Sequence, residues 1–161
     1  MEKSRKFILS LIQNKVINNK TDNLNRIKDL VEKSISIYNS QVIVLPEFCT
    51  TPIKGYVEKF AEEESNSETL QFFSKLSKDN NIYLIGGSIP ILDNNKYYNS
   101  CYCFDNKGEI QARYRKNHLF DIDIPGKMTN FESDTIAPGN DFTVFDTPYC
   151  KFGIGICYDI R

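Results

Sequence analysis

The sequence has 161 residues, with 20 Lys or Arg against 21 Asp or Glu, so its net charge is −1. This length corresponds to one domain, and the scattered basic residues exclude an extended surface for nucleic acid or anionic membrane. The five cysteines include no CxxC pair and the start shows no secretory pattern, which indicates a reducing interior. An apolar run at residues 7–12 is too short to cross a bilayer, so we expect a soluble protein.

The first part of the chain predicts a strand, a helix and a second strand. Residues 6–13 (KFILSLIQ) and 41–45 (QVIVL) are apolar runs typical of buried strands. Thr21, Asp22 or Asn23 can cap the helix between them, which makes a βαβ unit of an α/β fold. The apolar residues of this helix recur at steps of three and four, and they are Leu24, Ile27, Leu30, Val31, Ile35 and Tyr38.

The middle of the chain predicts a second helix and more strands. A loop at 46–56 precedes a helix at 67–79, with Leu70, Phe73 and Leu76 on its buried side, and a buried strand at 82–89 follows. The remaining segments are a hairpin at 96–115 that turns at 105–108, a long irregular segment at 117–140 and a last strand pair at 142–146 and 151–157. Irregular segments of this length are usually functional, so we expect a lid or a pocket wall there.

The last strand, KFGIGIC, ends at Cys157. Gly153 and Gly155 leave one face of this strand without side chains, so another group can approach its backbone closely. A cysteine at the end of a strand can present its thiol as a nucleophile, beside backbone N–H groups that can receive an oxyanion. A lone cysteine in an apolar strand is, however, more often a buried structural residue.

Two further charged residues also stand where a predicted strand ends. Glu47 follows the strand at 41–45, and Lys116 follows the second strand of the hairpin. The ends of strands are where α/β sheets gather ligands and hold catalytic side chains. A cysteine nucleophile needs a base, and both Glu47 and His118, the single histidine, remain open for that role.

Three segments resemble the signature motifs of the nitrilase superfamily, in the same order and with similar spacing. They are VLPEF (44–48), RYRKNHLFD (113–121) and GIGICYDIR (153–161). Within that superfamily, HLFDIDIPGKMTNFES and FDTPYCKFGIGICYDIR are similar to the omega-amidase branch. The resemblance covers nearly the whole chain, and three motifs with their flanks are far more specific than any one of them.

The resemblance implies a catalytic set of Glu47 as general base, Lys116 as electrostatic stabiliser and Cys157 as nucleophile. Glu132, which would otherwise be interpreted as a solvated loop carboxylate, matches a second active-site glutamate, and His118 becomes a structural residue. The other cysteines are interpreted as packing residues: Cys49, Cys101, Cys103 and Cys150.

The chemistry of amide hydrolysis suits these residue types. A free thiol titrates at about 8.5, so we expect Lys116 to favour the thiolate while Glu47 accepts the proton. Lys116 and the backbone N–H of Tyr158 would face the oxyanion, and a thioester acyl-enzyme would then be hydrolysed by water. This scheme uses no metal or organic cofactor, and no HExxH or CxxC motif is present.

The resemblance also implies an α-β-β-α sandwich, of which this chain represents the N-terminal portion. We therefore interpret residues 1–161 as a carbon–nitrogen hydrolase domain truncated on its C-terminal side, which would form a homodimer when full length. The missing elements would leave the apolar faces of the strands at 82–89 and 151–156 partly uncovered. The activity of the short chain itself is in doubt for the same reason.

The function implied is hydrolysis of the terminal amide of small dicarboxylic 2-oxo acids, such as 2-oxoglutaramate and 2-oxosuccinamate. Two alternatives stay open: a truncated chain that acts only as an interaction partner, and an enzyme of the same superfamily for a carbamoyl compound, an aliphatic amide or a nitrile. The resemblance is compatible with a cytoplasmic protein and also with a mitochondrial one.

Overall fold

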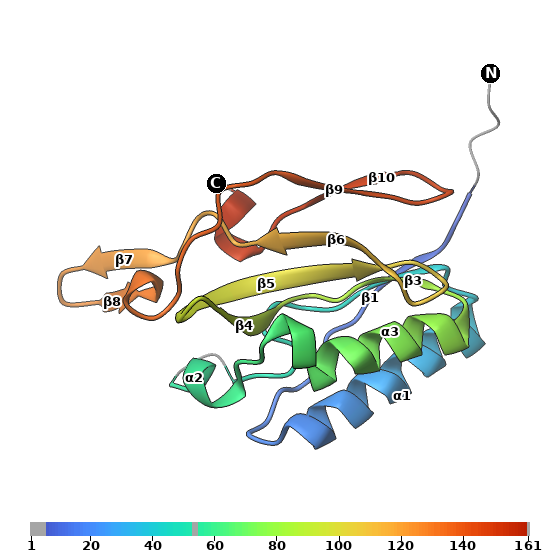
Figure 1. The fold of residues 1–161 in the computed structure, drawn as a ribbon, viewed down its shortest axis with the longest axis horizontal. Helices are drawn as coiled ribbons and strands as arrows, with labels where there is room; N and C mark the ends of the chain where they lie inside the picture. The colour runs from blue at the N-terminus through green and yellow to red at the C-terminus, as the bar shows by residue number, and fades with distance from the viewer. Residues whose placement is uncertain (1–5, 53–54, 161) are drawn as a thin grey trace.

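The computed structural model describes residues 6–52 and 55–160, and residues 1–5, 53–54 and 161 lie outside the described part. Two helices cover one face of a six-stranded sheet, and a two-stranded sheet lies on its other face (Figure 1). The helical segments are α1 (Lys20–Tyr38), α2 (Val57–Phe60), η1 (Glu64–Asn66), α3 (Glu68–Asn80), η2 (Glu132–Asp134) and η3 (Cys157–Ile160). The strands are β1 (Leu9–Leu11), β2 (Val42–Val44), β3 (Tyr83–Ile85), β4 (Ile89–Asp93), β5 (Lys96–Phe104), β6 (Ile110–Arg115), β7 (Asp121–Ile124), β8 (Met128–Phe131), β9 (Thr143–Asp146) and β10 (Lys151–Ile154).

The large sheet combines a parallel and an antiparallel part. Strands β1, β2 and β3 are parallel neighbours, and the βαβ unit predicted from the sequence is therefore confirmed as β1–α1–β2. Strand β5 runs antiparallel to β3 and β4, and also to β6. The predicted hairpin is confirmed as β5–β6, and the predicted last pair as the antiparallel sheet β9–β10.

The single strand predicted at 82–89 is wrong, because the chain breaks into β3 and β4 at residues 86–88. Gly87 has φ +61°, in the left-handed region that favours glycine, and both strands pair with β5 on either side of this break. A Cβ at Gly87 would lie 2.1 Å from the carbonyl oxygen of Pro46. The break between β3 and β4 therefore lies directly against the loop that follows β2.

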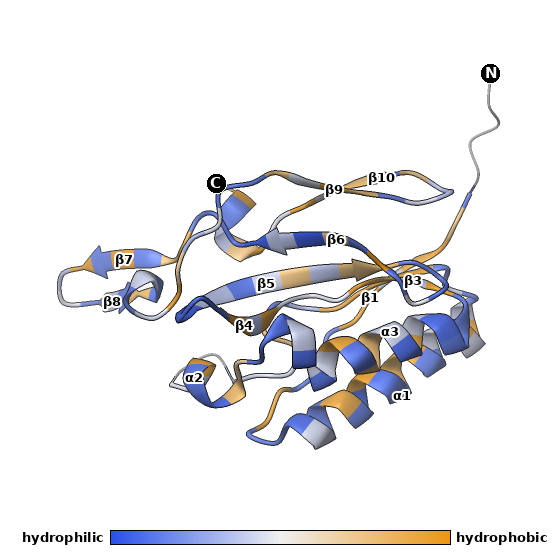
Figure 2. Ribbon diagram, in the orientation of Figure 1, coloured by the Kyte–Doolittle hydropathy of each residue, from blue (hydrophilic) through white to orange (hydrophobic). Residues whose placement is uncertain are grey.

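Helix α1 packs its apolar stripe on the sheet, as the sequence predicts, with two corrections. The stripe is visible as the orange side of α1 in Figure 2, but Tyr38 at its end is 59% exposed. The cap is Asn19, whose Oδ1 accepts a hydrogen bond from the backbone N–H of Asp22. Asn23 does not cap the helix because its side chain bonds the backbone of Ile17 and Thr50 instead.

Helix α3 follows the prediction closely. Ser67 caps it, and Leu70, Phe73 and Leu76 are buried against the sheet. The segment predicted to be irregular at 117–140 is only partly so, because it contains the antiparallel hairpin β7–β8 and the turn η2. This hairpin projects from one end of the molecule, at the left of Figure 1.

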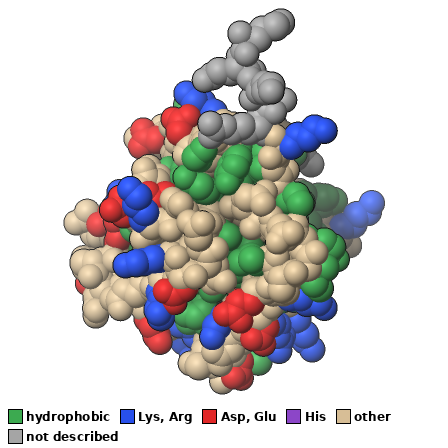
Figure 3. Space-filling model, turned by 90° about the vertical axis from the view of Figure 1, so that its right-hand side faces the viewer, with side chains coloured by type: hydrophobic (Ala, Val, Ile, Leu, Met, Phe, Trp, Pro, Cys, Tyr) green, Lys and Arg blue, Asp and Glu red, His purple; other side chains and the backbone are tan. Residues whose placement is uncertain are grey.

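Of the two strands expected to be partly uncovered, the one at 151–156 is so, with Phe152 and Ile154 half-buried, whereas residues 82–89 are largely buried. The exposed apolar side chains also include Leu11 on β1, which is 72% exposed, and Val144 on β9, which is 51% exposed. The expectation of a fully buried strand at 6–13 is wrong because β1 lies at the edge of the sheet, where β2 is its one partner among the described strands. Figure 3 shows hydrophobic side chains at the surface on the side where the chain begins.

Candidate active site

Cys157 lies on a tight turn just after β10. The strand ends at Ile154, three residues earlier than the sequence predicts, and Cys157 begins the turn η3 with φ +47°. A non-glycine residue in this left-handed region is strained, and such strain clusters at functional sites. The thiol belongs to an exposed residue, so the interpretation as a buried structural cysteine is wrong.

Glu47 lies in the loop after β2, and the neighbouring strand break fixes that loop. The backbone N–H of Phe48 donates to Ser88 Oγ at 3.0 Å, and the N–H of Cys49 donates to the Ser88 carbonyl at 3.1 Å. Phe48 itself has φ +49°, so the chain turns sharply directly after the glutamate. These contacts hold Glu47 at the end of β2, as the sequence predicts.

Lys116 follows β6 and lies between two carboxylates. Its ammonium Nζ is 2.9 Å from Glu47 Oε1 and 2.9 Å from Glu132 Oε2, and the side chain is 2% exposed. Burial lowers the pKa of Lys116, but the hydrogen bonds to Glu132 and Glu47 outweigh it and hold the pKa above its usual value. Lys116 is therefore a permanently charged group buried beside the thiol.

Glu132 reaches the site from η2, in the segment where we expected a pocket wall. Its Oε2 also accepts a hydrogen bond from the backbone N–H of Phe120 at 2.7 Å. The ring of Phe120 packs edge-on against Tyr158, the residue after Cys157, with ring centroids 5.3 Å apart. The structure thus brings Glu47, Lys116 and Glu132 into direct contact and joins their segment to the turn of Cys157.

Asn99, on β5, is a site residue that the sequence reasoning missed. Its Nδ2 donates to Glu47 Oε1 at 2.8 Å and lies 3.5 Å from Glu132 Oε1, and the residue is fully buried. Its Oδ1 is buried without a hydrogen-bond partner among the described residues, because the amide nitrogen has to face the two carboxylates. The sequence signal that points to Asn99 is a side-chain amide inside a segment predicted to be a strand.

The expected balance of charge at the thiol is wrong. The pKa of Cys157 is raised above its usual value, first by burial and then by the negative charge of Glu47, while Lys116 acts in the opposite direction. Because Lys116 is shared by two carboxylates, its positive charge does not dominate the environment of the thiol. The thiol is therefore protonated at neutral pH and requires a base to take its proton.

His118 and the other cysteines lie outside this cluster. The His118 ring is 60% exposed, and its Nδ1 lies 3.0 Å from Asp159 Oδ1. Among the remaining cysteines, three are buried as the packing interpretation predicts, but Cys150 is exposed, which contradicts it. In the described part of the chain, no group of three or more His, Cys, Asp or Glu side chains could hold a metal ion.

A cavity of about 260 Å³ opens beside the thiol and is lined by both Glu47 and Cys157. Its other walls are apolar side chains and the glycine backbone of β10, including Val44, Ile85, Phe152, Gly153 and Ile154. Contrary to the expected close approach, a Cβ at Gly153 would meet no atom within 4 Å. The glycine face of β10 therefore leaves room for a ligand instead of for another backbone.

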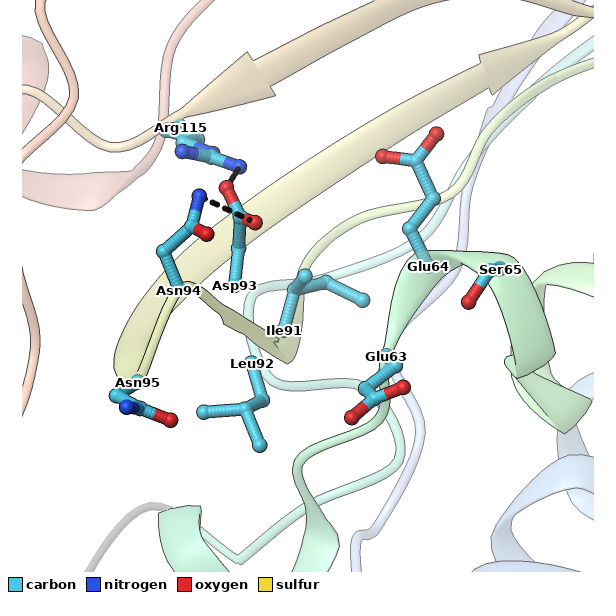
Figure 4. Close-up of a pocket in the computed structure, with 9 residues that line it drawn as sticks. All are labelled: Glu63, Glu64, Ser65, Ile91, Leu92, Asp93, Asn94, Asn95 and Arg115. Carbon is cyan, nitrogen blue, oxygen red and sulfur yellow. Dashed lines mark hydrogen bonds and ion pairs between the residues drawn. The ribbon is translucent and has the colours of Figure 1, made fainter.

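A second pocket, of about 370 Å³, lies between β4 and η1 (Figure 4). Its charged lining consists of Glu63, Glu64, Asp93 and Arg115, and Arg115 is paired with Asp93 at 2.7 Å. None of the residues that line it carries a thiol, and its charged residues are not joined to a buried lysine as Glu47 is. The smaller cavity at Cys157 is therefore the candidate active site.

Comparison with known proteins identifies the family. The model of the family described as carbon–nitrogen hydrolase matches residues 9–161. The chain belongs to this family. Omega-amidase NIT2-B of Xenopus laevis is 46% identical over 157 residues, which are 97% of this chain and 56% of that protein. Omega-amidase NIT2 of Homo sapiens is 44% identical over 156 residues, covering 96% of this chain and 56% of the human protein.

Solved structures of the nitrilase superfamily share the fold. Saccharomyces cerevisiae Nit3, a member of branch 10 of that superfamily, aligns with a TM-score of 0.77 at 35% identity, over 88% of this chain and 51% of Nit3. The mixed α/β architecture and the membership of the nitrilase superfamily, predicted from the sequence, are thus confirmed, and the chain spans about half the length of the relatives it matches. No helix in the described carbon–nitrogen hydrolase segment is long and apolar enough to cross a membrane.

Proposed function

We propose that this carbon–nitrogen hydrolase is an amidohydrolase of the omega-amidase type, with Cys157 as nucleophile, Glu47 as general base and Lys116 as electrostatic stabiliser. The observation that carries the proposal is the contact of buried Lys116 with both Glu47 and Glu132, together with the cavity that Glu47 shares with the exposed Cys157. Such a set supplies a nucleophile and a proton acceptor in one cavity, and a fixed positive charge in contact with that acceptor.

The first half of the reaction forms a thioester. Glu47 takes the proton of the Cys157 thiol as the sulfur bonds to the amide carbon, and the carbonyl oxygen becomes an oxyanion. The Lys116 ammonium and the backbone N–H of Tyr158 face this oxyanion, a type of contact worth on the order of a hundredfold in rate. When the C–N bond breaks, protonated Glu47 gives its proton to the departing nitrogen, and ammonia leaves.

The second half restores the enzyme. Glu47 accepts a proton from water as the water oxygen bonds to the thioester carbon. The C–S bond then breaks, the acid leaves, and the Cys157 sulfur recovers the proton held by Glu47. Throughout both halves Glu132 holds Lys116, because its Oε2 is anchored by the N–H of Phe120.

The substrate class is inferred from the relatives named omega-amidase. We propose the terminal amide of small dicarboxylic 2-oxo acids, with 2-oxoglutaramate and 2-oxosuccinamate as the first compounds to test. We also propose that residues 1–161 represent one carbon–nitrogen hydrolase domain, and that the protein acts as a cytoplasmic homodimer.

The test combines ammonia release with intact-protein mass spectrometry after incubation with 2-oxoglutaramate. We expect ammonia and a transient acyl adduct on the parent chain, and neither on Cys157→Ala. Cys150→Ala, which removes the other exposed thiol, is the matched control and should behave like the parent. A folded parent chain that forms no adduct and releases no ammonia would contradict the proposal for this chain. An adduct with another linear amide only would keep the chemistry and change the substrate.

A further inference from the structure

The carboxylate of Asp159, two residues after Cys157, is surrounded by hydrogen-bond donors. Its Oδ2 accepts from the Tyr114 hydroxyl at 2.6 Å and from the Ile156 N–H at 2.8 Å. Its Oδ1 accepts from the His118 N–H at 2.8 Å, and His118 Nδ1 lies 3.0 Å away. The side chain is 8% exposed. Buried polar groups are normally hydrogen-bonded, and these partners build the Asp159 carboxylate into the fold.

The contacts with Ile156 close the turn around Cys157. The Asp159 side chain accepts from the Ile156 N–H, and the Asp159 N–H donates to the Ile156 carbonyl at 3.1 Å. The side chain of the third residue thus reaches back to the residue before the turn, as in one half of a capping box. Cys157 lies inside the closed turn with its left-handed φ of +47°. Without the carboxylate, only the bond from the Asp159 N–H to the Ile156 carbonyl would remain of the two contacts that close the turn.

The other contacts of Asp159 reach the segment that carries the charged lysine. Tyr114 lies two residues before Lys116 and His118 two residues after it. Lys116 itself is fixed by its backbone N–H, which donates to the Asn99 carbonyl at 2.9 Å. One carboxylate therefore joins the turn of the nucleophile to the short segment that holds Lys116. The same donors outweigh burial and hold the pKa of Asp159 below its usual value, so the group stays ionised near neutral pH.

We propose that Asp159 is a positioning residue that sets the Cys157 thiol against Glu47 and Lys116 by tying its turn to residues 114–118. The proposal rests on the proposed function, since it takes Glu47 as the group that faces the thiol. Asp159 touches no reacting atom in this scheme. Its role is to hold the Cys157 thiol close to Glu47, so that the charge of Glu47 acts on the thiol.

A double-mutant cycle tests this coupling without requiring turnover. In a Cys150→Ser background, which leaves Cys157 as the exposed thiol among the described cysteines, the rate of alkylation by iodoacetamide at pH 8 is followed by intact mass. Glu47→Gln removes a charge that raises the pKa of Cys157, so we expect it to speed alkylation by about three- to tenfold. In the Asp159→Ala background we expect the same substitution to change the rate by less than about 1.5-fold, because the thiol no longer lies against Glu47.

The control for Asp159→Ala is Asp146→Ala. It removes an exposed aspartate, so the full Glu47→Gln effect on the alkylation rate should persist in that background. An equal Glu47→Gln effect in folded Asp159→Ala would overturn the inference and leave the proposed function intact. A Glu47→Gln substitution that changes nothing in the parent would reject the proposed function and the inference with it.

A second variant covers the case in which Asp159→Ala does not fold, as judged by circular dichroism. Asp159→Asn keeps the size of the side chain but has one acceptor oxygen, so it cannot bond both Ile156 and His118. We expect the Glu47→Gln effect to fall at least by half in this background. Retention of the whole effect would contradict the proposal.

Discussion

Lys116 is buried between two carboxylates, and this single fact sets the protonation of the thiol beside it. A lone lysine beside a cysteine would favour the thiolate. Here the two carboxylates neutralise that effect, and burial together with Glu47 leaves the pKa of Cys157 raised. In the proposed mechanism the thiol therefore passes its proton to Glu47 at the moment of attack.

Asn99 allows a prediction at the same scale. Asn99→Ala removes one of the two donors on Glu47 Oε1, so the carboxylate is held by Lys116 alone at that oxygen. We expect kcat/KM for ammonia release to fall roughly ten- to a hundredfold, because the base is less well oriented. The measurement is the steady-state rate of ammonia release by the variant beside Asn66→Ala, an exposed asparagine in η1 that should leave kcat/KM unchanged. An unchanged kcat/KM in folded Asn99→Ala would show that Asn99 has only a packing role.

The sequence could identify the charged residues of the site but not the groups that orient them. Glu47, Lys116 and Cys157 follow strands and lie in recognisable motifs, so pattern was enough to single them out. Asn99 contacts Glu47 from a strand 52 positions further along the chain, and Asp159 contacts Tyr114 across 45 positions. Such contacts depend on the register of the paired strands, which a single sequence does not reveal.

At the scale of elements, Glu62 anchors the start of α3. Its carboxylate accepts from the Ser67 hydroxyl at 2.7 Å and from the Thr69 N–H at 3.0 Å, and it pairs with Lys20 at 2.8 Å. The carboxylate thus supplements the Ser67 cap and ties α3 to the first residue of α1. Burial raises its pKa, but these partners outweigh burial and hold the pKa below 4.5.

Glu62→Gln should therefore lower the free energy of unfolding by about 1–2 kcal/mol at pH 7. Because the folded-state pKa is depressed, this stabilisation is present above the unfolded pKa of 4.5 and is lost as the pH falls through the folded value. The measurement is urea unfolding from pH 7 down to pH 3, where the difference between variant and parent should shrink. Glu68→Gln, an exposed glutamate on the same helix, is the control and should differ little from the parent. A difference that does not depend on pH would contradict the assignment.

Elements with an apolar pattern that repeats over many residues were predicted well. Elements whose bounds depend on the backbone conformation of a glycine were predicted poorly. Both long helices and the βαβ unit follow from apolar spacing over a dozen or more residues. The break between β3 and β4 depends on the positive φ of Gly87, which apolar spacing does not reveal. The β7–β8 hairpin was missed because each strand has only four residues, and Pro125 and Gly126 between them led to the prediction of an irregular segment.

At the scale of the whole molecule, the three layers leave apolar side chains at the surface on β1 and β9. Leu11 and Val144 are 72% and 51% exposed. Strand β1 is also a sheet edge in the described part, a combination that favours association between chains. We expect the 161-residue chain to self-associate as its concentration rises.

Leu11→Lys should weaken this self-association, because a charge on an edge strand opposes pairing. Light scattering coupled to size-exclusion chromatography over a hundredfold range of concentration is the measurement. Ile37→Lys provides the comparison, since Ile37 is also exposed but lies on helix α1 and not on a sheet edge. If both variants weaken association equally, the edge strand is not its cause.

The glycine face of β10 leaves empty space in the wall of the cavity beside Cys157. Gly153 lies in its wall with open space where a side chain would stand, whereas Gly87, in the same wall, has the backbone of Pro46 against it. An engineer could therefore add methyl, hydroxymethyl or isopropyl groups at position 153 to exclude longer amides in graded steps, while position 87 admits no such variation. On the proposed function, substrate length is therefore adjustable from β10, which leads to the proposed nucleophile, and hardly at all from the break between β3 and β4 at Gly87.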